Sequence, residues 1–224
     1  MKCDFHIHSC YSYDSASRPK DIIDTAIKRG IQCVAIADHG NIRGSLEARE
    51  YAQGLPILVI VSEEVKSKQG DILALNIKEP IPNKLSAEET ITRIHSQSGT
   101  AVIAHPFGSM CGFDGDMKEV MQRAEAMEVL NASVFWGNKL ALEFMKKNDC
   151  AFTVGSDAHF TNFIGKVWLE LPVEYKKTLT PEFVMESVKS KIGMIGGKVG
   201  SFAEKAIDHP KRNLCKIGLL KPRA

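Results

Sequence analysis

Short apolar runs of strand length alternate with amphipathic stretches along almost the whole chain, and this alternation restricts the fold more than any other feature. Strands are predicted at Cys3–Ile7, Cys33–Ala37, Ile57–Val61, Ile72–Ile77, Ala101–Ala104, Ala126–Leu130, Ala151–Val154 and Val167–Leu171. Helices are predicted at Pro19–Lys28, Ser45–Gln53, Ser86–Gln97, Met117–Ala124, Lys139–Lys147 and Pro181–Ser190. Because strands that alternate with helices usually run parallel, about seven such units predict a closed or nearly closed α/β barrel. An open doubly wound sheet is the second choice.

The composition is that of an ordinary globular protein. The 224 residues, 44% hydrophobic and 25% charged, are enough for one sizeable core, and the net charge of +2 gives no overall reason to expect nucleic acid or a membrane as partner. No apolar run approaches the about 18 residues of a membrane span, and the first residues lack the pattern of a signal peptide. Six cysteines without a C-x-x-C pair favour reduced thiols over a disulfide framework. These features predict a cytoplasmic protein with no membrane association and no obligate protein partner.

The C-terminal segment differs from the rest of the chain in charge. From Lys198 onward it holds seven basic residues and two acidic ones. We therefore divide the chain into a barrel over residues 1–197 and a basic extension of the same domain over residues 198–224. The simpler interpretation of this extension is a solvated, partly ordered tail. The alternative is an arm that steers an anionic substrate.

Histidines and acids follow the predicted strands at the point where each strand ends. His6 and His8 lie two positions apart, and alternate residues of an extended strand point to the same face. The same feature recurs after four later strands, at Asp38-His39, Glu63-Glu64, His105 and Asp157-Ala158-His159. In barrels the carboxyl ends of the strands form the rim where active sites lie. Five of the seven histidines are therefore expected together at one end of the barrel.

This mixture of side chains indicates divalent metal ions. Any one of these residues alone has a plainer explanation, as a turn residue or as a hydrogen-bonded core histidine. Burying so many ionisable groups together would be costly without a cation. Imidazole and carboxylate are the ligands that ions such as Mn, Fe and Zn bind in proteins. The set therefore predicts a metal centre, and the identity of the metal stays open.

Five segments resemble, in the same order, the motifs of the polymerase and histidinol phosphatase (PHP) family. They are Asp4-Phe5-His6-Ile7-His8 with Tyr11-Ser12-Tyr13-Asp14-Ser15, Ala37-Asp38-His39-Gly40, Glu64, Ala104-His105-Pro106 and Gly155-Ser156-Asp157-Ala158-His159. The resemblance spans residues 2–171. It implies a distorted (β/α)7 TIM-like barrel that binds two or three divalent ions and hydrolyses phosphate esters.

The resemblance also implies which residues bind which ion. One ion would be bound by His6, His8, Glu64 and Asp157, a second by Asp14, His39 and His159, and a third by Glu64 and His105, with Glu64 bridging. Asp14 has the alternative explanation of a turn residue before the next helix. Many members of the family supply a further histidine to the third ion soon after the bridging glutamate, and residues 70–74 contain none. The third ion is therefore expected to bind weakly or only with substrate.

The expected reaction is hydrolysis of a phosphate monoester. Two ions about 3.5–4 Å apart can lower the pKa of a bridging water and clamp phosphoryl oxygens, so that a metal-bridging hydroxide attacks phosphorus. Asp157 or His159 would assist proton transfer. Arg43 and Asn131 follow strands at the same rim and are predicted to contact the phosphate. Both also have plain explanations, Arg43 as a solvated residue at the start of a helix and Asn131 as a turn residue.

Two other functions stay open. An amidohydrolase-like barrel would use the same first motif on C–N bonds, but such barrels usually have a bridging carboxylated lysine. A non-catalytic metal-binding module is disfavoured by the nearly complete set of ligands. The substrate would be a small phosphorylated molecule, including a metabolite phosphate such as histidinol phosphate, a nucleotide or a short oligonucleotide.

Three ionisable residues near these motifs are not predicted to be ligands. Glu63 should face away from its neighbour Glu64, because successive residues of a strand point to opposite faces. His95 lies within a predicted helix. His209 lies in the basic extension and is expected to face solvent.

Overall fold

Nine strands form a single sheet in the computed structural model, which describes residues 1–109, 111–176 and 178–220. The strands are β1 (Lys2–Ile7), β2 (Cys33–His39), β3 (Leu58–Lys66), β4 (Asp71–Leu75), β5 (Thr100–Ile103), β6 (Ala126–Asn131), β7 (Phe152–Gly155), β8 (Val167–Glu170) and β9 (Met194–Gly197). Their order in the sheet is β7-β6-β5-β4-β3-β2-β1-β8-β9. Strands that follow one another in the sequence are therefore neighbours across most of the sheet.

The sheet curls until its first and seventh strands meet. A parallel bridge joins Ile7 at the end of β1 to Ala158 just beyond β7. The His8 amide donates to the Ala158 carbonyl at 2.8 Å, and the Asp157 amide donates to the His6 carbonyl at 2.7 Å. The fold is thus a distorted TIM-like barrel, and the barrel predicted from the strand and helix pattern is confirmed.

One strand within the barrel runs against the direction that the alternation predicts. β4 is antiparallel to both β3 and β5, and β8 is antiparallel to β1. Only residues 67–70 separate β3 from β4, where the Ser67 amide donates to the Gly70 carbonyl at 3.0 Å. A parallel crossover needs a dozen or more residues, so this short turn can only form a hairpin.

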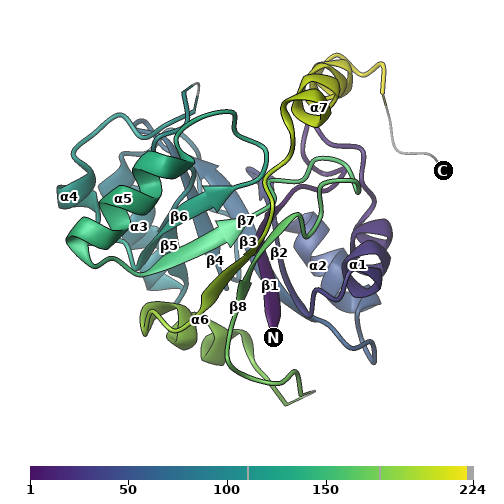
Figure 1. Ribbon diagram of the computed structural model, residues 1–224, viewed down its shortest axis with the longest axis horizontal. Coiled ribbons are helices and arrows are strands. Elements are labelled where there is room, and N and C mark those ends of the chain that lie inside the picture. Colours follow the sequence, from purple (N-terminus) through teal and green to yellow (C-terminus); the bar gives the residue numbers. More distant parts are fainter. Residues whose placement is uncertain (110, 177, 221–224) are drawn as a thin grey trace.

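Helices cover the outside and both ends of the barrel. They are α1 (Pro19–Lys28), α2 (Arg43–Tyr51), α3 (Ala87–Ser96), α4 (Met117–Val120), α5 (Asn138–Asn148), α6 (Pro181–Lys189) and α7 (Phe202–Lys216). Figure 1 shows α1 and α2 on one side of the sheet and α3, α4 and α5 on the other. Because helices cover the sheet, strand residues such as Phe5, Ile36 and Ile60 are completely buried.

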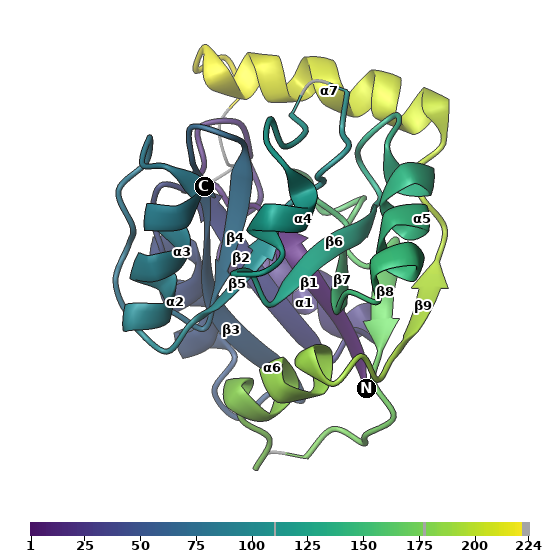
Figure 2. The ribbon, with the colours of Figure 1, turned by 90° about the vertical axis from the view of Figure 1, so that its left-hand side faces the viewer.

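The described part of the basic C-terminal segment contains the helix α7, most of whose side chains are exposed. Ser201 and Glu204 form a capping box at the start of this helix, and β9, just before the segment, pairs with β8. The division of the chain at residue 198 stays a prediction. α7 lies across one end of the barrel, and α6 lies at the opposite end (Figure 2). Residues 221–224 of the predicted extension lie outside the described residues. No helix in the described part of the chain is both long and apolar enough to cross a membrane.

Candidate metal centre

The strands β1, β2 and β3 carry histidine and glutamate into one end of the barrel. β2 and β3 extend further than predicted, so that His39 and Glu64 are paired residues of neighbouring parallel strands. His6 belongs to β1, and His8 follows that strand directly. Glu64 faces His6 and His39, whereas Glu63 faces away and accepts a hydrogen bond from the Ile81 amide at 3.0 Å. The structure therefore orients Glu63 and Glu64 as the alternation of a strand predicts.

The first group of donor atoms joins β1 to the segment beyond β7. The Nε2 atoms of His6 and His8 lie 3.1 Å apart. His8 Nε2 lies 3.4 Å from Asp157 Oδ1 and 3.4 Å from Glu64 Oε2. All four side chains are buried. These are the four residues predicted for the first ion.

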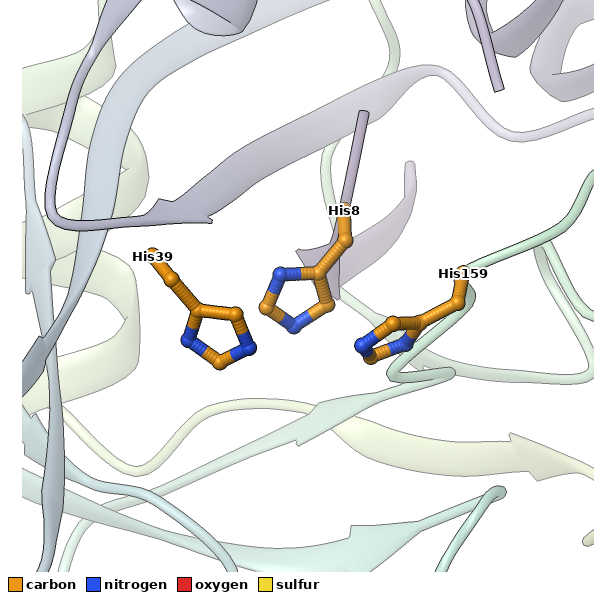
Figure 3. Close-up of side chains that lie close together, drawn as sticks. All are labelled: His8, His39 and His159. Carbon is orange, nitrogen blue, oxygen red and sulfur yellow. The ribbon is translucent and has the colours of Figure 1, made fainter. Parts of the chain in front are cut away.

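The second group lies around His39 and His159. Figure 3 shows the imidazoles of His39 and His159 on either side of His8, each from a different part of the chain. The two oxygens of Asp14 lie 3.5 Å from His39 Nε2 and 3.3 Å from His159 Nε2. Asp14 is 4% exposed, so it is part of the centre rather than a surface turn residue.

The third group lies around Glu64 and His105. Glu64 Oε1 lies 3.0 Å from His105 Nε2, and its other oxygen lies 3.1 Å from His39 Nδ1. The His105 ring stacks on that of His6, with ring centroids 5.7 Å apart. The two oxygens of Glu64 therefore face different groups, as a bridging carboxylate must.

The donor atoms fit divalent ions in spacing and in chemistry. Ligand atoms about 2.0–2.2 Å from one ion lie about 3–4 Å from each other, and the distances in all three groups fall in this range. Asp14 Oδ1 and His159 Nε2 are buried in the described structure and have no hydrogen-bond partner. Unpartnered buried polar atoms are costly, and a cation between them would satisfy both. Seven of the eight residues predicted as ligands thus form clusters able to bind metal, and Asp14 lies beside His39 and His159.

The ionisation of these residues favours a cation. Burial opposes the charge on Glu64, yet His6 and His39 hold its pKa well below the usual range. Burial and the neighbouring His159 and His39 lower the pKa of His8 to about 3. The glutamate is therefore ionised and the imidazole of His8 is neutral near pH 7, which are the forms that bind metal. Burial opposes the charge on His6 and His39, but the neighbouring carboxylates raise the pKa of both, so these two histidines would release protons when an ion binds.

A second layer of polar residues orients the candidate ligands. Glu128 Oε1 lies 3.1 Å from His6 Nδ1, and its other oxygen accepts from the His105 amide at 2.9 Å. Asp38 accepts from the amide and hydroxyl of Ser9. Sequence reasoning missed Glu128, although a lone acid within the apolar strand Ala126–Asn131 is a signal that could have identified it. Such partners fix the tautomer and orientation of ligating histidines.

The two predicted phosphate contacts lie in different surroundings. Asn131 is 1% exposed, its amide nitrogen donates to Glu128 at 3.0 Å and to Asp157 at 3.4 Å, and its oxygen accepts from two backbone amides. Its hydrogen-bonding atoms already have partners, which favours a role in orienting these two acids, and its contact with a phosphate stays a prediction. Arg43 is exposed at the first position of α2, and its role stays a prediction.

The two histidines outside the motifs differ from each other. His95 is partly exposed and pairs with Glu125 at 2.8 Å. His209 was expected to face solvent, but it belongs to α7 and is half-buried there, with its Nε2 3.4 Å from the Ser133 carbonyl oxygen. The helix around it explains the error, because α7 was not predicted.

Two of the candidate ligands have left-handed backbone conformations. His105 has φ 27° and Asp157 has φ 49°. Non-glycine residues rarely adopt positive φ, and such positions persist where the surrounding structure enforces them, commonly at functional sites. Both residues follow a strand end, and their side chains contact Glu64 and His8 respectively.

Comparison with known sequences gives one consistent family. The family model described as the PHP domain matches residues 4–203. An uncharacterized protein of Methanocaldococcus jannaschii is 37% identical over 142 residues, which are 59% of this chain and 82% of that protein. A second uncharacterized protein of the same organism is 30% identical over 203 residues, 85% of this chain and 80% of its own length.

Solved structures share the fold at much lower identity. A two-domain protein from Bacteroides vulgatus, described as containing a predicted PHP-like metal-dependent phosphoesterase, has a TM-score of 0.72 and 17% identity over 88% of this chain. This chain spans 65% of that protein. An amidohydrolase from Chromobacterium violaceum has a TM-score of 0.60 and 16% identity, over 86% of this chain and 97% of its own. These two structures support the fold alone.

Proposed function

We propose, from the premise that this chain belongs to the PHP domain family, that it is a metal-dependent phosphoesterase that hydrolyses phosphate monoesters. The observation that carries the proposal is the convergence of eight imidazole and carboxylate side chains at one end of the barrel. The groups adjoin one another, because His6 lies close to Glu64 and His105 of the third group, and His8 lies close to His39 and His159 of the second. Neighbouring ions that share ligands are the arrangement that phosphoryl transfer uses.

The chain's own residues would bind and orient the reactants. Bound divalent ions would supply an acidic water and neutralise the charge that grows on the phosphoryl oxygens. Glu64 would hold the groups at a fixed separation, because its two oxygens face different histidines. Glu128 would keep the His6 ring in one orientation through its contact with Nδ1. We propose Asp157 or His159 for proton transfer to the leaving oxygen, and Arg43 as a contact for the phosphate.

The nature of the bridging ligand favours phosphate esters over C–N bonds. The residue between the groups is Glu64, which contacts four histidines, namely His6, His8, His39 and His105. Amidohydrolase-like barrels usually place a carboxylated lysine there. The shared fold with an amidohydrolase therefore does not by itself assign that reaction.

A substrate screen tests the proposal directly. Protein loaded with Mn²⁺ or Zn²⁺ would be incubated with sugar phosphates, nucleoside monophosphates, short oligonucleotides and amide substrates. We expect metal-dependent release of inorganic phosphate from at least one phosphoester. The control is the double variant His6→Ala/His8→Ala, which should bind less metal and release none. Phosphate release by the double variant, or no release from any phosphoester by the loaded protein, would contradict the proposal.

We propose at least two tightly bound divalent ions per chain and a weaker third. The third group has Glu64 and His105 but lacks the additional histidine, and Asp71 lies near it. Burial, and Glu64 beside it, raise the pKa of Asp71 to about 6. Anomalous scattering from crystals grown with and without phosphate would measure occupancy. We expect the third site to gain occupancy with phosphate and to lose it first on mild chelation. Equal occupancy of three ions after chelation would mean that a residue such as Asp71 completes the third site. Finding one ion or none per chain would contradict the proposal of two tightly bound ions.

A further inference from the structure

Helix α7 turns its polar side chains toward the metal centre and its apolar side chains outward. Lys205 and Asp208 are buried on its inner face. Phe202, Ile207 and Leu214 are 72%, 60% and 41% exposed on the outer face. Surface helices normally show the reverse arrangement, because burial of an apolar face holds them in place. Contact with charged groups beneath it, rather than apolar packing, therefore explains the position of α7.

Both halves of α7 are attached to the loop that follows β6. The Lys205 ammonium donates to the Val134 carbonyl, and the Arg212 guanidinium donates to the Ser133 hydroxyl. Lys166 donates to Glu204 near the start of the helix at 2.5 Å. These polar contacts hold the helix across this end of the barrel (Figure 2).

Two cationic side chains of α7, one helical turn apart, each lie near an acid of the metal centre. Arg212 donates to the Asp157 carbonyl at 3.1 Å, and its Nη1 lies 3.8 Å from Asp157 Oδ1. Lys216 Nζ lies 4.0 Å from Asp14 Oδ2. Asp157 belongs to the first group and Asp14 to the second. The spacing i, i+4 puts both cations on one face of α7, above both groups.

We propose that Arg212 and Lys216 bind the phosphoryl oxygens of the substrate, so that α7 is an anion-binding cap over the metal centre. The proposal rests on the proposed function. A divalent ion on Asp157 or Asp14 neutralises that carboxylate and repels the cation beside it, unless an anion lies between them. A phosphate bound by two ions supplies this anion, with further oxygens directed away from the metals. Arginine pairs with such oxygens through two parallel hydrogen bonds, and lysine adds a point charge.

Binding of inorganic phosphate measures the cap separately from catalysis. Titration calorimetry on Mn²⁺-loaded protein would compare the wild type with Arg212→Met and Lys216→Met, with metal content and thermal unfolding recorded for each. Loss of one charge-assisted contact should raise the Kd for phosphate at least about tenfold in each variant, with the metal content unchanged. Lys211→Met is the matched control, because Lys211 is exposed on the same helix and lies near the Phe160 ring. Its Kd should stay within about twofold of wild type.

Three results would overturn the proposal. The first is an unchanged Kd in both variants, the second an equal loss in Lys211→Met, and the third a loss of metal that accounts for the loss of phosphate binding. If Arg212→Met does not fold, Arg212→Lys replaces it, and an unchanged Kd in both Arg212→Lys and Lys216→Met is decisive against the cap. If the variants lose phosphate while the wild type hydrolyses no phosphoester, the cap stands and the proposed function fails. If the wild type hydrolyses a phosphoester while the variants bind phosphate as the wild type does, the proposed function stands and the cap fails.

Discussion

The metal centre and the helix α7 above it differ in secondary structure and in burial. The candidate ligands lie on strands or next to them, and His6 and His8 are completely buried. Arg212 and Lys216 come from a helix, and their side chains are 13% and 45% exposed. The ligands are held by a layer of hydrogen bonds, whereas α7 is held by contacts with a loop and with the ligands themselves. From this difference we expect the centre to be fixed before a substrate binds and α7 to be the part that adjusts to it.

The two regions also differ in what stabilises them. The strands bury long apolar runs, and each buried aliphatic side chain contributes roughly 1.5–3 kcal/mol. The residues that α7 buries are Lys205, Asp208 and Cys215, of which only the cysteine is apolar. Regions with few buried apolar contacts open at lower free energy than the core. We therefore expect α7 to separate from the barrel without unfolding it.

The largest effect should come from Glu64, which contacts four histidines of the metal centre. Glu64→Gln removes the charge shared by the groups, and phosphoesterase activity should fall at least about 1,000-fold, with loss of bound metal. Glu63→Gln is the matched control. Burial raises the pKa of Glu63 to about 7, so a neutral amide suits its position. Metal analysis and initial rates on both variants give the test, and equal losses in both would show that the strand face has been assigned wrongly.

A smaller loss is expected at Asp157, the acid that both regions contact. Asp157→Asn keeps the shape of the side chain and removes the charge, and turnover should fall about 100-fold. A loss below about tenfold, or 1.4 kcal/mol, would place Asp157 outside the electrostatics of the transition state. Measuring kcat and KM separately distinguishes this role from substrate binding by α7.

Glu128 tests the layer behind the ligands. Glu128→Gln keeps one acceptor near His6 but removes the negative charge, and metal affinity should fall about 10-fold to 100-fold, as is typical for such partners. A chelator competition measured at fixed pH gives the affinity. An affinity equal to wild type would mean that the His6 ring is oriented by the barrel alone.

The smallest effect is expected on the outer face of α7. Ile207 is 60% exposed, so Ile207→Ser should change the free energy of unfolding by less than about 0.5 kcal/mol. Ile36 is completely buried, and Ile36→Ala should cost about 2–5 kcal/mol. Urea unfolding of both variants gives the comparison. A large loss for Ile207→Ser would show that the outer face packs against a partner.

The sequence predicts the barrel and the centre better than the cap, for physical reasons. His6, His8 and Glu64 follow from the two-residue period of strands and from the convergence of strand ends. The direction of β4 depends on a short turn around Gly70, which the alternation of elements does not encode. The inner face of α7 has the periodicity of a helix but carries charged residues, namely Lys205, Asp208 and Arg212. Hydrophobic patterning therefore predicts that the opposite, apolar face of α7 is the buried one. Glu128 was missed because it lies inside a strand rather than at its end.

The bridge between Ile7 and Ala158 has a consequence for how the molecule comes apart. It is a seam between the first and seventh strands of the barrel, and donor atoms of His8 and Asp157 lie on its two sides. An ion bound to both would act as a cross-link that closes a loop of most of the chain, and any ligand that binds only the folded state raises its stability by mass action. Chelation should then lower the melting temperature, and hydrogen exchange should accelerate first in β1 and at Asp157–Ala158. The ions proposed for catalysis would then also stabilise the closed barrel, so that loss of activity and opening of the barrel would begin at the same place.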